Sequence, residues 1–110
     1  MTLFTGKGDN GTTSWSCDQR ISKSSATAEA LGSLDEINSF LGLCKVQAAY
    51  LDFKLGETSL AEIVHEMQKN LFIVQAELAG TNKTIEKRKV KELEEIIDQI
   101  ERELPPIKSF

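Results

Sequence analysis

Residues 59–80, which read SLAEIVHEMQKNLFIVQAELAG, decide the fold. Their apolar residues recur at steps of three and four, the spacing of one helix face: Leu60, Ile63, Val64, Met67, Leu71, Val74 and Leu78. Ser59 and Glu62 have the spacing of a capping box, and Gly80 is typical of the position just after a helix. The stretch therefore predicts an amphipathic helix that starts after Ser59 and stops at Gly80.

This helix is expected to be apolar on more than one side. Residues 71–74 are Leu, Phe, Ile and Val in succession, so their side chains point around most of the helix. One flanking helix on each side cannot cover that whole surface. We therefore expect part of it to contact another subunit, or helices that are absent from this chain.

Helical periodicity continues on both sides of this stretch. The segment after residue 27 carries a stripe formed by Leu31, Leu34, Ile37 or Asn38, Leu41, and Cys44 or Lys45. Residues 52–56 are expected to form a loop. A third helix is expected after Thr84, ending at Pro105-Pro106, with an apolar face formed by Val90, Leu93, Ile97, Ile100 and Leu104.

These elements predict an all-α fold. Short connections make neighbouring helices antiparallel, so the expected architecture is an antiparallel bundle of three helices. We expect a single domain over residues 1–110, with the helical bundle at 28–110 and a glycine-rich loop segment at 1–27. With 110 residues, the chain has the length of one domain.

Composition excludes several classes of protein. The net charge is -4, which gives no broad positive surface for nucleic acid. There is no run of about 18 apolar residues that would span a membrane. Cys17 and Cys44 match neither a disulfide framework nor a zinc site, so we expect inert thiols, no protein-bound metal, and a cytoplasmic location.

The N-terminal segment contains the strongest indication of chemistry. Residues 5–14 read TGKGDNGTTS, in which the glycines let backbone amides approach an anion and the hydroxyls add donors. Lys7 and Lys23 supply positive charge for phosphate oxygens. Taken alone, the segment fits phosphate binding and a flexible terminus about equally well. It is neither a dinucleotide fingerprint, which needs a preceding strand, nor a Walker A loop.

Three blocks in order carry a family resemblance. They are TGKGDNGTTS at 5–14, RISK at 20–23, and EALGSLDEINS at 29–39 followed by Leu41-Gly42. Together they resemble the PduO-type ATP:cob(I)alamin adenosyltransferases in both content and spacing. The stretches QKNLF at 68–72 and ELA at 77–79 are similar to a later helix of that family. The resemblance therefore extends over essentially the whole chain.

The resemblance implies an enzyme that transfers the 5′-deoxyadenosyl group of ATP to cob(I)alamin and releases tripolyphosphate. ATP with Mg²⁺ and cob(I)alamin would be its substrates, and they would bind between the subunits of a homotrimer of helical bundles. The chain would resemble part of a five-helix, ferritin-like bundle. The family's two C-terminal helices would be missing, so we expect a chain that is truncated at its C-terminus.

Site residues are carried over from the family by position. The residues implied to contact ATP are Thr5, Gly6, Lys7, Gly8, Thr13, Ser14 and Lys23. Asp35 would lie at the subunit interface in an ion pair. Phe110 would lie near the aromatic residue that displaces the lower cobalt ligand. The chain departs from the family pattern at Gly6, where a basic residue is usual, and at Lys7, where Thr or Asn is usual.

Alternative hypotheses remain at this stage. The chain is an adenosyltransferase or its N-terminal part, a catalytically impaired homologue that acts only as an ATP-binding module, or a structural oligomer of helices. Trp15 is expected either to stack on a ring or to cover the end of the bundle. His65 is expected to be structural or exposed, because one histidine without a partner is rarely a ligand or a base.

Overall fold

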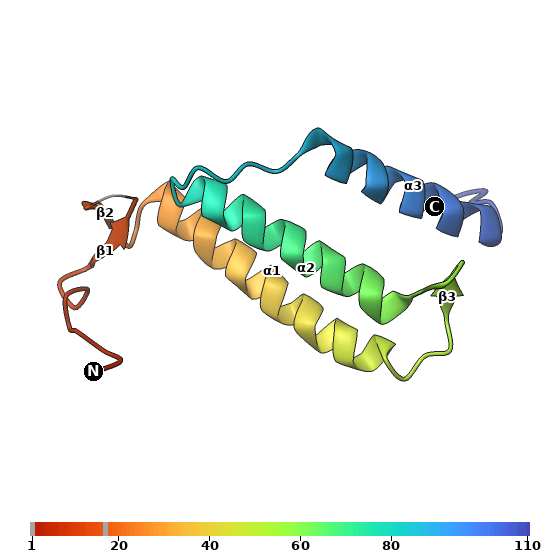
Figure 1. Ribbon diagram of the computed structural model, residues 1–110, viewed down its shortest axis with the longest axis horizontal. Coiled ribbons are helices and arrows are strands. Elements are labelled where there is room, and N and C mark those ends of the chain that lie inside the picture. Colours follow the sequence, from red (N-terminus) through yellow and green to blue (C-terminus); the bar gives the residue numbers. More distant parts are fainter. Residues whose placement is uncertain (1, 17) are drawn as a thin grey trace.

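The computed structural model describes residues 2–16 and 18–110, and the expectation for Cys17 lies outside them. Three helices dominate: α1 at Ala26–Ala48, α2 at Leu60–Leu78 and α3 at Lys87–Glu103. Figure 1 shows α1 and α2 side by side and antiparallel, with α3 running back along α2. The three predicted helices and their antiparallel order are confirmed.

The expectation of an all-α fold is corrected by two small hairpins. Strands β1, Thr12–Trp15, and β2, Gln19–Ser22, pair antiparallel, with Thr12 opposite Ser22. Strands β3, Lys54–Leu55, and β4, Thr58–Ser59, form the second hairpin, in the segment that was predicted to be a loop. These strands are too short to show a period in the sequence, and Gly56 at φ +61° makes the second turn possible.

Helix α2 begins as the sequence predicted. The Ser59 amide donates to Glu62 Oε2 at 2.7 Å, and the Glu62 amide donates to Ser59 Oγ at 3.2 Å. The hydrogen bond from the Ser59 amide is the main cause that lowers the pKa of Glu62 below its ordinary value. The reciprocal bonds satisfy two amides that would otherwise lack a partner, so the capping box fixes the first turn of α2.

Replacing Ser59 with alanine is expected to destabilise the fold by about 1 kcal/mol, the usual effect of losing an N-cap hydroxyl. Urea denaturation followed by circular dichroism measures the change. Ser39→Ala, at an exposed position within α1, is the matched control and should change stability by less than about 0.5 kcal/mol. Equal effects of the two substitutions would contradict the importance of the cap.

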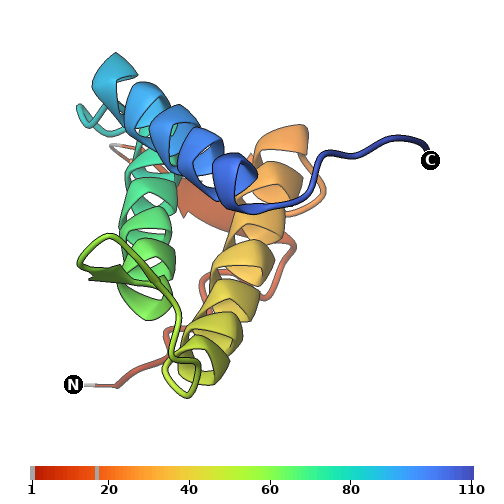
Figure 2. The ribbon, with the colours of Figure 1, turned by 90° about the vertical axis from the view of Figure 1, so that its right-hand side faces the viewer.

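The core is smaller than three closely packed helices would give. Among the described residues, only Ala48, Leu55, Ile63 and Val64 are buried apolar residues. In the end view of Figure 2, α3 lies to one side of the α1–α2 pair. The radius of gyration is 18.3 Å, whereas a compact domain of this length has about 13 Å. The three helices of one copy therefore do not enclose a compact core by themselves.

The stripe predicted for α1 is confirmed, whereas the stripe predicted for α3 differs from the structure. In α1 the stripe positions Leu31, Leu34, Asn38, Leu41, Cys44 and Lys45 are all half-buried, whereas Ile37, the alternative to Asn38, is 50% exposed. In α3, Ile97 is 47% exposed, and Ile96 beside it is half-buried. Ile96 and Ile97 are neighbours in the sequence of α3, so periodicity alone cannot decide which of them faces α2.

Candidate functional site

The glycine-rich loop is built from two consecutive turns. The Asp9 amide donates to the Gly6 carbonyl at 3.1 Å, and the Gly11 amide donates to the Gly8 carbonyl at 3.2 Å. Gly6 and Gly11 have φ values of +68° and +90°, a conformation that side chains disfavour. The Lys23 amide then donates to the Gly11 carbonyl at 2.9 Å, which fastens the loop to the end of β2.

The side chain of Lys23 lies against Gly8, as is required if both residues contact the same phosphate. A Cβ atom on Gly8 would lie 3.2 Å from Lys23 Nζ and 3.1 Å from the Thr12 carbonyl oxygen. Glycine therefore leaves room for the ammonium group beside the backbone of the loop. Within the described residues, no hydrogen bond or ion pair includes Lys23 Nζ, so its charge is available to an anion.

Arg20 holds the loop and the hairpin together. Its guanidinium donates to the Lys7 carbonyl at 2.8 Å, to the Thr12 carbonyl at 3.0 Å and to Ser14 Oγ at 3.2 Å. It also donates to Thr12 Oγ1, from Nε at 3.0 Å and from Nη2 at 2.9 Å. The amino-acid sequence alone does not assign a functional role to Arg20. Arg20 could have been identified only from the pairing of β1 with β2, which places Arg20 opposite Ser14.

The β1–β2 hairpin is anchored on the C-terminal end of α2. Trp15 Nε1 donates to the Leu78 carbonyl at 3.0 Å, and Ser16 Oγ donates to the Gly80 carbonyl at 3.1 Å. Trp15 therefore covers the end of the helical pair, one of the two roles expected for it. These bonds occupy carbonyls that the end of α2 leaves free, and they fix the position of the loop on the bundle.

Gly80→Ala is expected to loosen this attachment and to destabilise the chain by about 1–2 kcal/mol. Gly80 has a φ of +84°, and an added Cβ would lie 2.5 Å from Ser16 Cβ. Thermal denaturation measures the loss, and the control is Gly32→Ala in α1, where an added Cβ meets nothing within 4 Å. Since alanine favours helices over glycine, the control should stabilise the chain by up to about 1 kcal/mol. A stabilised Gly80→Ala variant would contradict the packing described here.

Asp35 lies on α1, about 14 Å along the helix from its first residue. Gln75 of α2 donates from Nε2 to Asp35 Oδ1, and no ion pair includes Asp35 within the described residues. Phe110 is fully exposed, and Figure 1 shows the C-terminus far from the hairpin. A single copy of the chain thus brings Lys23 and Gly8 together but does not bring Phe110 to the loop.

A groove of about 490 Å³, lined by polar side chains and by Phe72 and Ile73, follows the α1–α2 pair. Gln68 Nε2 donates to the Asn38 carbonyl at 3.0 Å, and Lys45 Nζ lies 3.0 Å from His65 Nδ1. Asn38 Oδ1 is buried and has no hydrogen-bond partner within the described residues. His65 is exposed, one of the two situations expected for it, and lies beside Lys45.

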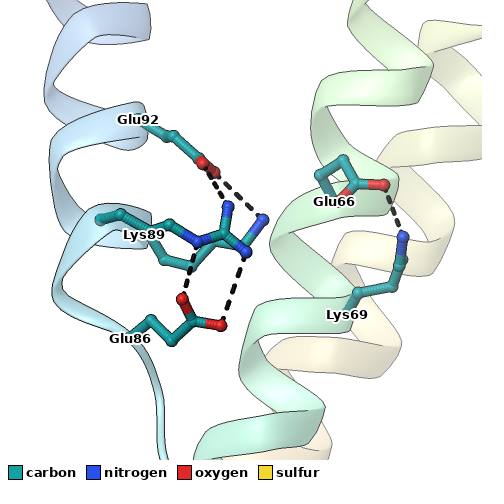
Figure 3. Close-up of polar contacts among 6 residues, drawn as sticks. Glu66, Lys69, Glu86, Lys89 and Glu92 are labelled. Carbon is teal, nitrogen blue, oxygen red and sulfur yellow. Dashed lines mark hydrogen bonds and ion pairs between the residues drawn. The ribbon is translucent and has the colours of Figure 1, made fainter.

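Two separate groups of ion pairs lie on α2 and at the start of α3 (Figure 3). The ion pairs are Lys69–Glu66 at 2.7 Å, Arg88–Glu86 at 2.7 Å, Arg88–Glu92 at 2.8 Å and Lys89–Glu92 at 3.0 Å. Hydrogen bonds from their basic partners lower the pKa of each carboxylate. The pairs are therefore intact at neutral pH and are lost as the pH falls below the ordinary value near 4.3. Exposed pairs of this kind add little stability.

Within residues 2–16 and 18–110, no group of three or more His, Cys, Asp or Glu side chains could hold a metal ion. In the same part of the chain, no helix is long and apolar enough to cross a membrane. The chemistry available at the loop is therefore that of backbone amides, hydroxyls and lysine, a set of donors that suits an oxyanion.

The fold and this loop define a helical protein with a glycine-rich loop and a β-hairpin attached to the end of α2. The family model described as cobalamin adenosyltransferase matches residues 3–110. The chain belongs to the cobalamin adenosyltransferase family, and the resemblance seen in the sequence is confirmed.

Two curated relatives have similar sequences. A corrinoid adenosyltransferase of Citrobacter freundii is 36% identical over 115 residues, which cover 98% of this chain and 61% of the relative. The corrinoid adenosyltransferase PduO of Salmonella typhimurium is 33% identical over 117 residues, covering 100% of this chain and 33% of the relative. The chain thus spans about three fifths of one relative and one third of the other.

Solved structures agree with this assignment. A variant of the PduO-type ATP:corrinoid adenosyltransferase from Lactobacillus reuteri, in complex with cobalamin and ATP, superposes with a TM-score of 0.83 at 26% identity. The match covers 99% of this chain and 60% of that chain. A second variant of the same protein, in complex with ATP, has a TM-score of 0.79 and covers 98% of this chain and 61% of that chain.

Proposed function

We propose that the N-terminal loop binds the triphosphate of ATP, accompanied by Mg²⁺. The observation that carries this proposal is the close approach of Lys23 Nζ to Gly8, with no competing partner for the ammonium in the described structure. Thr5, Gly6, Lys7, Thr13 and Ser14 complete the proposed set of ATP contacts. The solved structures of a family member in complex with ATP support the assignment.

The proposed reaction is the transfer of the 5′-deoxyadenosyl group of ATP to cob(I)alamin. The cobalt supplies an electron pair and forms a bond to the 5′ carbon of the ribose. The bond from that carbon to the phosphate oxygen breaks, and tripolyphosphate leaves with its electron pair. The loop amides and Lys23 would hold the leaving triphosphate in line and stabilise the charge that develops on it.

Asp35 and Phe110 are proposed to complete the site from a subunit interface. Asp35 is exposed beside Gln75, and its second carboxylate oxygen remains free for a partner from outside the chain. Phe110 lies away from the loop of its own copy, so its proposed position near the corrinoid requires a neighbouring subunit. Both roles are carried over by position within the family.

We also propose a homotrimer in the cytoplasm. The accessible surface is 8991 Å², whereas a monomer of 12.2 kDa exposes about 6,000 Å². The excess greatly exceeds the roughly 800 Å² that each partner buries in a standard interface. Much of it is apolar, including Phe40, Leu43 and Phe72, which are 57–65% exposed. Protein surfaces rather than water are expected to cover these side chains.

The function is tested by following the loss of cob(I)alamin absorbance under reducing conditions, with and without ATP. Loss that requires ATP, together with release of tripolyphosphate, is the expected result. A chain that binds ATP without transfer would be the binding module considered in the sequence analysis. A chain that does neither would be a structural helical oligomer, and the proposed function would be wrong.

A further inference from the structure

Arg20 is surrounded by hydrogen-bond acceptors and has no carboxylate partner. Its guanidinium contacts the carbonyl oxygens of Lys7 and Thr12 and the hydroxyl oxygens of Thr12 and Ser14. No ion pair in the described structure includes Arg20. An arginine that serves only as a surface charge does not gather neutral acceptors from both a turn and a strand. The arrangement therefore indicates that the planar fork of donors is what the site requires.

The contacts determine which atoms the loop presents to an anion. Carbonyl oxygens carry partial negative charge and would repel a polyphosphate, and Arg20 binds two of them, from Lys7 and Thr12. Ser14 Oγ accepts a hydrogen bond from Arg20 Nη1 at 3.2 Å, so its own O–H hydrogen remains available to donate. With these acceptors occupied, donors dominate the remaining surface of the loop.

Arg20 also joins parts of the loop that the backbone alone leaves separate. Lys7 lies within the first turn, whereas Thr12 begins β1, and the guanidinium bonds to both. Thr12 Oγ1 in turn donates to Asn10 Oδ1 at 3.0 Å, which extends the network into the second turn. Ordering a loop before a ligand arrives removes part of the entropy cost of binding.

We propose that Arg20 is a positioning residue, which orders the loop for the triphosphate through hydrogen bonds to Lys7, Thr12 and Ser14 and without touching the phosphate itself. This inference rests on the proposed ATP site. This positioning depends on the geometry of the guanidinium group and not on its positive charge. Lysine therefore cannot replace Arg20.

The test compares Arg20→Gln and Arg20→Lys in the full chain, with Arg88→Gln on α3 as the matched arginine control. The first measurement is the backbone order parameter of Gly8 and Gly11 by NMR without ligand. Values are expected to fall from near 0.85 to below about 0.6 in both Arg20 variants, while amides of α1 and α2 keep their values. Arg88→Gln should change neither glycine, because its partners are Glu86, which caps α3, and Glu92 within α3. Unchanged loop order in the Arg20 variants would overturn the inference.

The second measurement is calorimetric binding of ATP with Mg²⁺. Both Arg20 variants are expected to raise Kd about tenfold, because each must order the loop upon binding. Wild-type affinity in Arg20→Lys would show that charge suffices and would overturn the inference. Thr12→Val, which removes a shared acceptor, should weaken binding in the same direction, and Thr12→Ser should not.

The two measurements separate this inference from the function on which it rests. If the wild-type chain does not bind ATP, the proposed function is wrong, and the predicted loss of ATP affinity in the Arg20 variants is wrong with it. The order parameters still decide whether Arg20 organises the loop. Normal ATP binding by all Arg20 variants, together with loss of binding in Lys23→Ala, would overturn the inference and leave the function intact.

Discussion

Lys23→Ala is expected to weaken the binding of ATP by roughly 10- to 150-fold, because a hydrogen bond to a charged group contributes about 1.5–3 kcal/mol. The ammonium lies beside Gly8 with no partner in the described structure, so alanine removes charge from the loop without leaving a buried group unpaired. The loss should be smaller at high salt, which screens the attraction between lysine and phosphate. Isothermal titration calorimetry at two salt concentrations measures both effects.

Lys91→Ala is the matched control for this experiment. Lys91 is exposed on α3 and takes part in no hydrogen bond or ion pair within the described residues. Its removal lowers the net charge by the same amount as Lys23→Ala, but at a distance from the loop. Equal affinities in the wild type and Lys23→Ala would contradict the assignment of Lys23 to the phosphate.

The second large effect concerns assembly. The chain is expected to form an oligomer in solution, and Phe40→Ser combined with Leu43→Ser should shift it strongly toward the monomer. Both side chains are more than half exposed on the same helix. Burying a large apolar side chain contributes about 1.5–3 kcal/mol, so each substitution weakens association substantially. Analytical ultracentrifugation over a range of concentrations measures the change.

Ile107→Ser is the control for the assembly experiment, because Ile107 is 77% exposed but follows the end of α3 instead of lying on α1. It should leave the sedimentation of the chain nearly unchanged. A wild-type chain that sediments as a monomer at every concentration would contradict the proposed homotrimer. It would also leave the apolar side chains of α1 exposed to water.

Helix α2 could be predicted from sequence because its signals are local. The bonds between Ser59 and Glu62 form within one turn, and Gly80 has the positive φ that a helix end requires. Bonds from the Gly80 and Thr81 amides to the carbonyls of Glu77 and Ala76 complete this end. Such features depend on neighbours along the chain and not on tertiary packing.

The face that α3 presents to α2 could not be predicted in the same way. Its positions 96 and 97 are both isoleucine, and either would continue an apolar stripe. The choice depends on where α3 lies relative to α2, which is a tertiary property. The small hairpins were missed for a related reason, because a strand of two to four polar residues has no period to detect.

The site was predicted in part. Glycines, hydroxyls and Lys23 could be assigned to phosphate binding by their chemistry and by the resemblance of three sequence blocks. The role of Arg20 depends on the register of β1 and β2, which places it opposite Ser14 and within reach of the Lys7 carbonyl. A residue whose hydrogen bonds reach the other strand of a hairpin cannot be given a role until the pairing of the two strands is known.

The central claim is that the N-terminal loop holds the triphosphate of ATP. A titration of the ¹⁵N-labelled chain with ATP and Mg²⁺, followed through backbone amide shifts, tests this claim most directly. The account predicts saturable shifts concentrated at the amides of residues 6–14 and at Lys23, and much weaker shifts with adenosine alone. Saturable shifts confined to the helices, or no shifts at millimolar ATP, would contradict it.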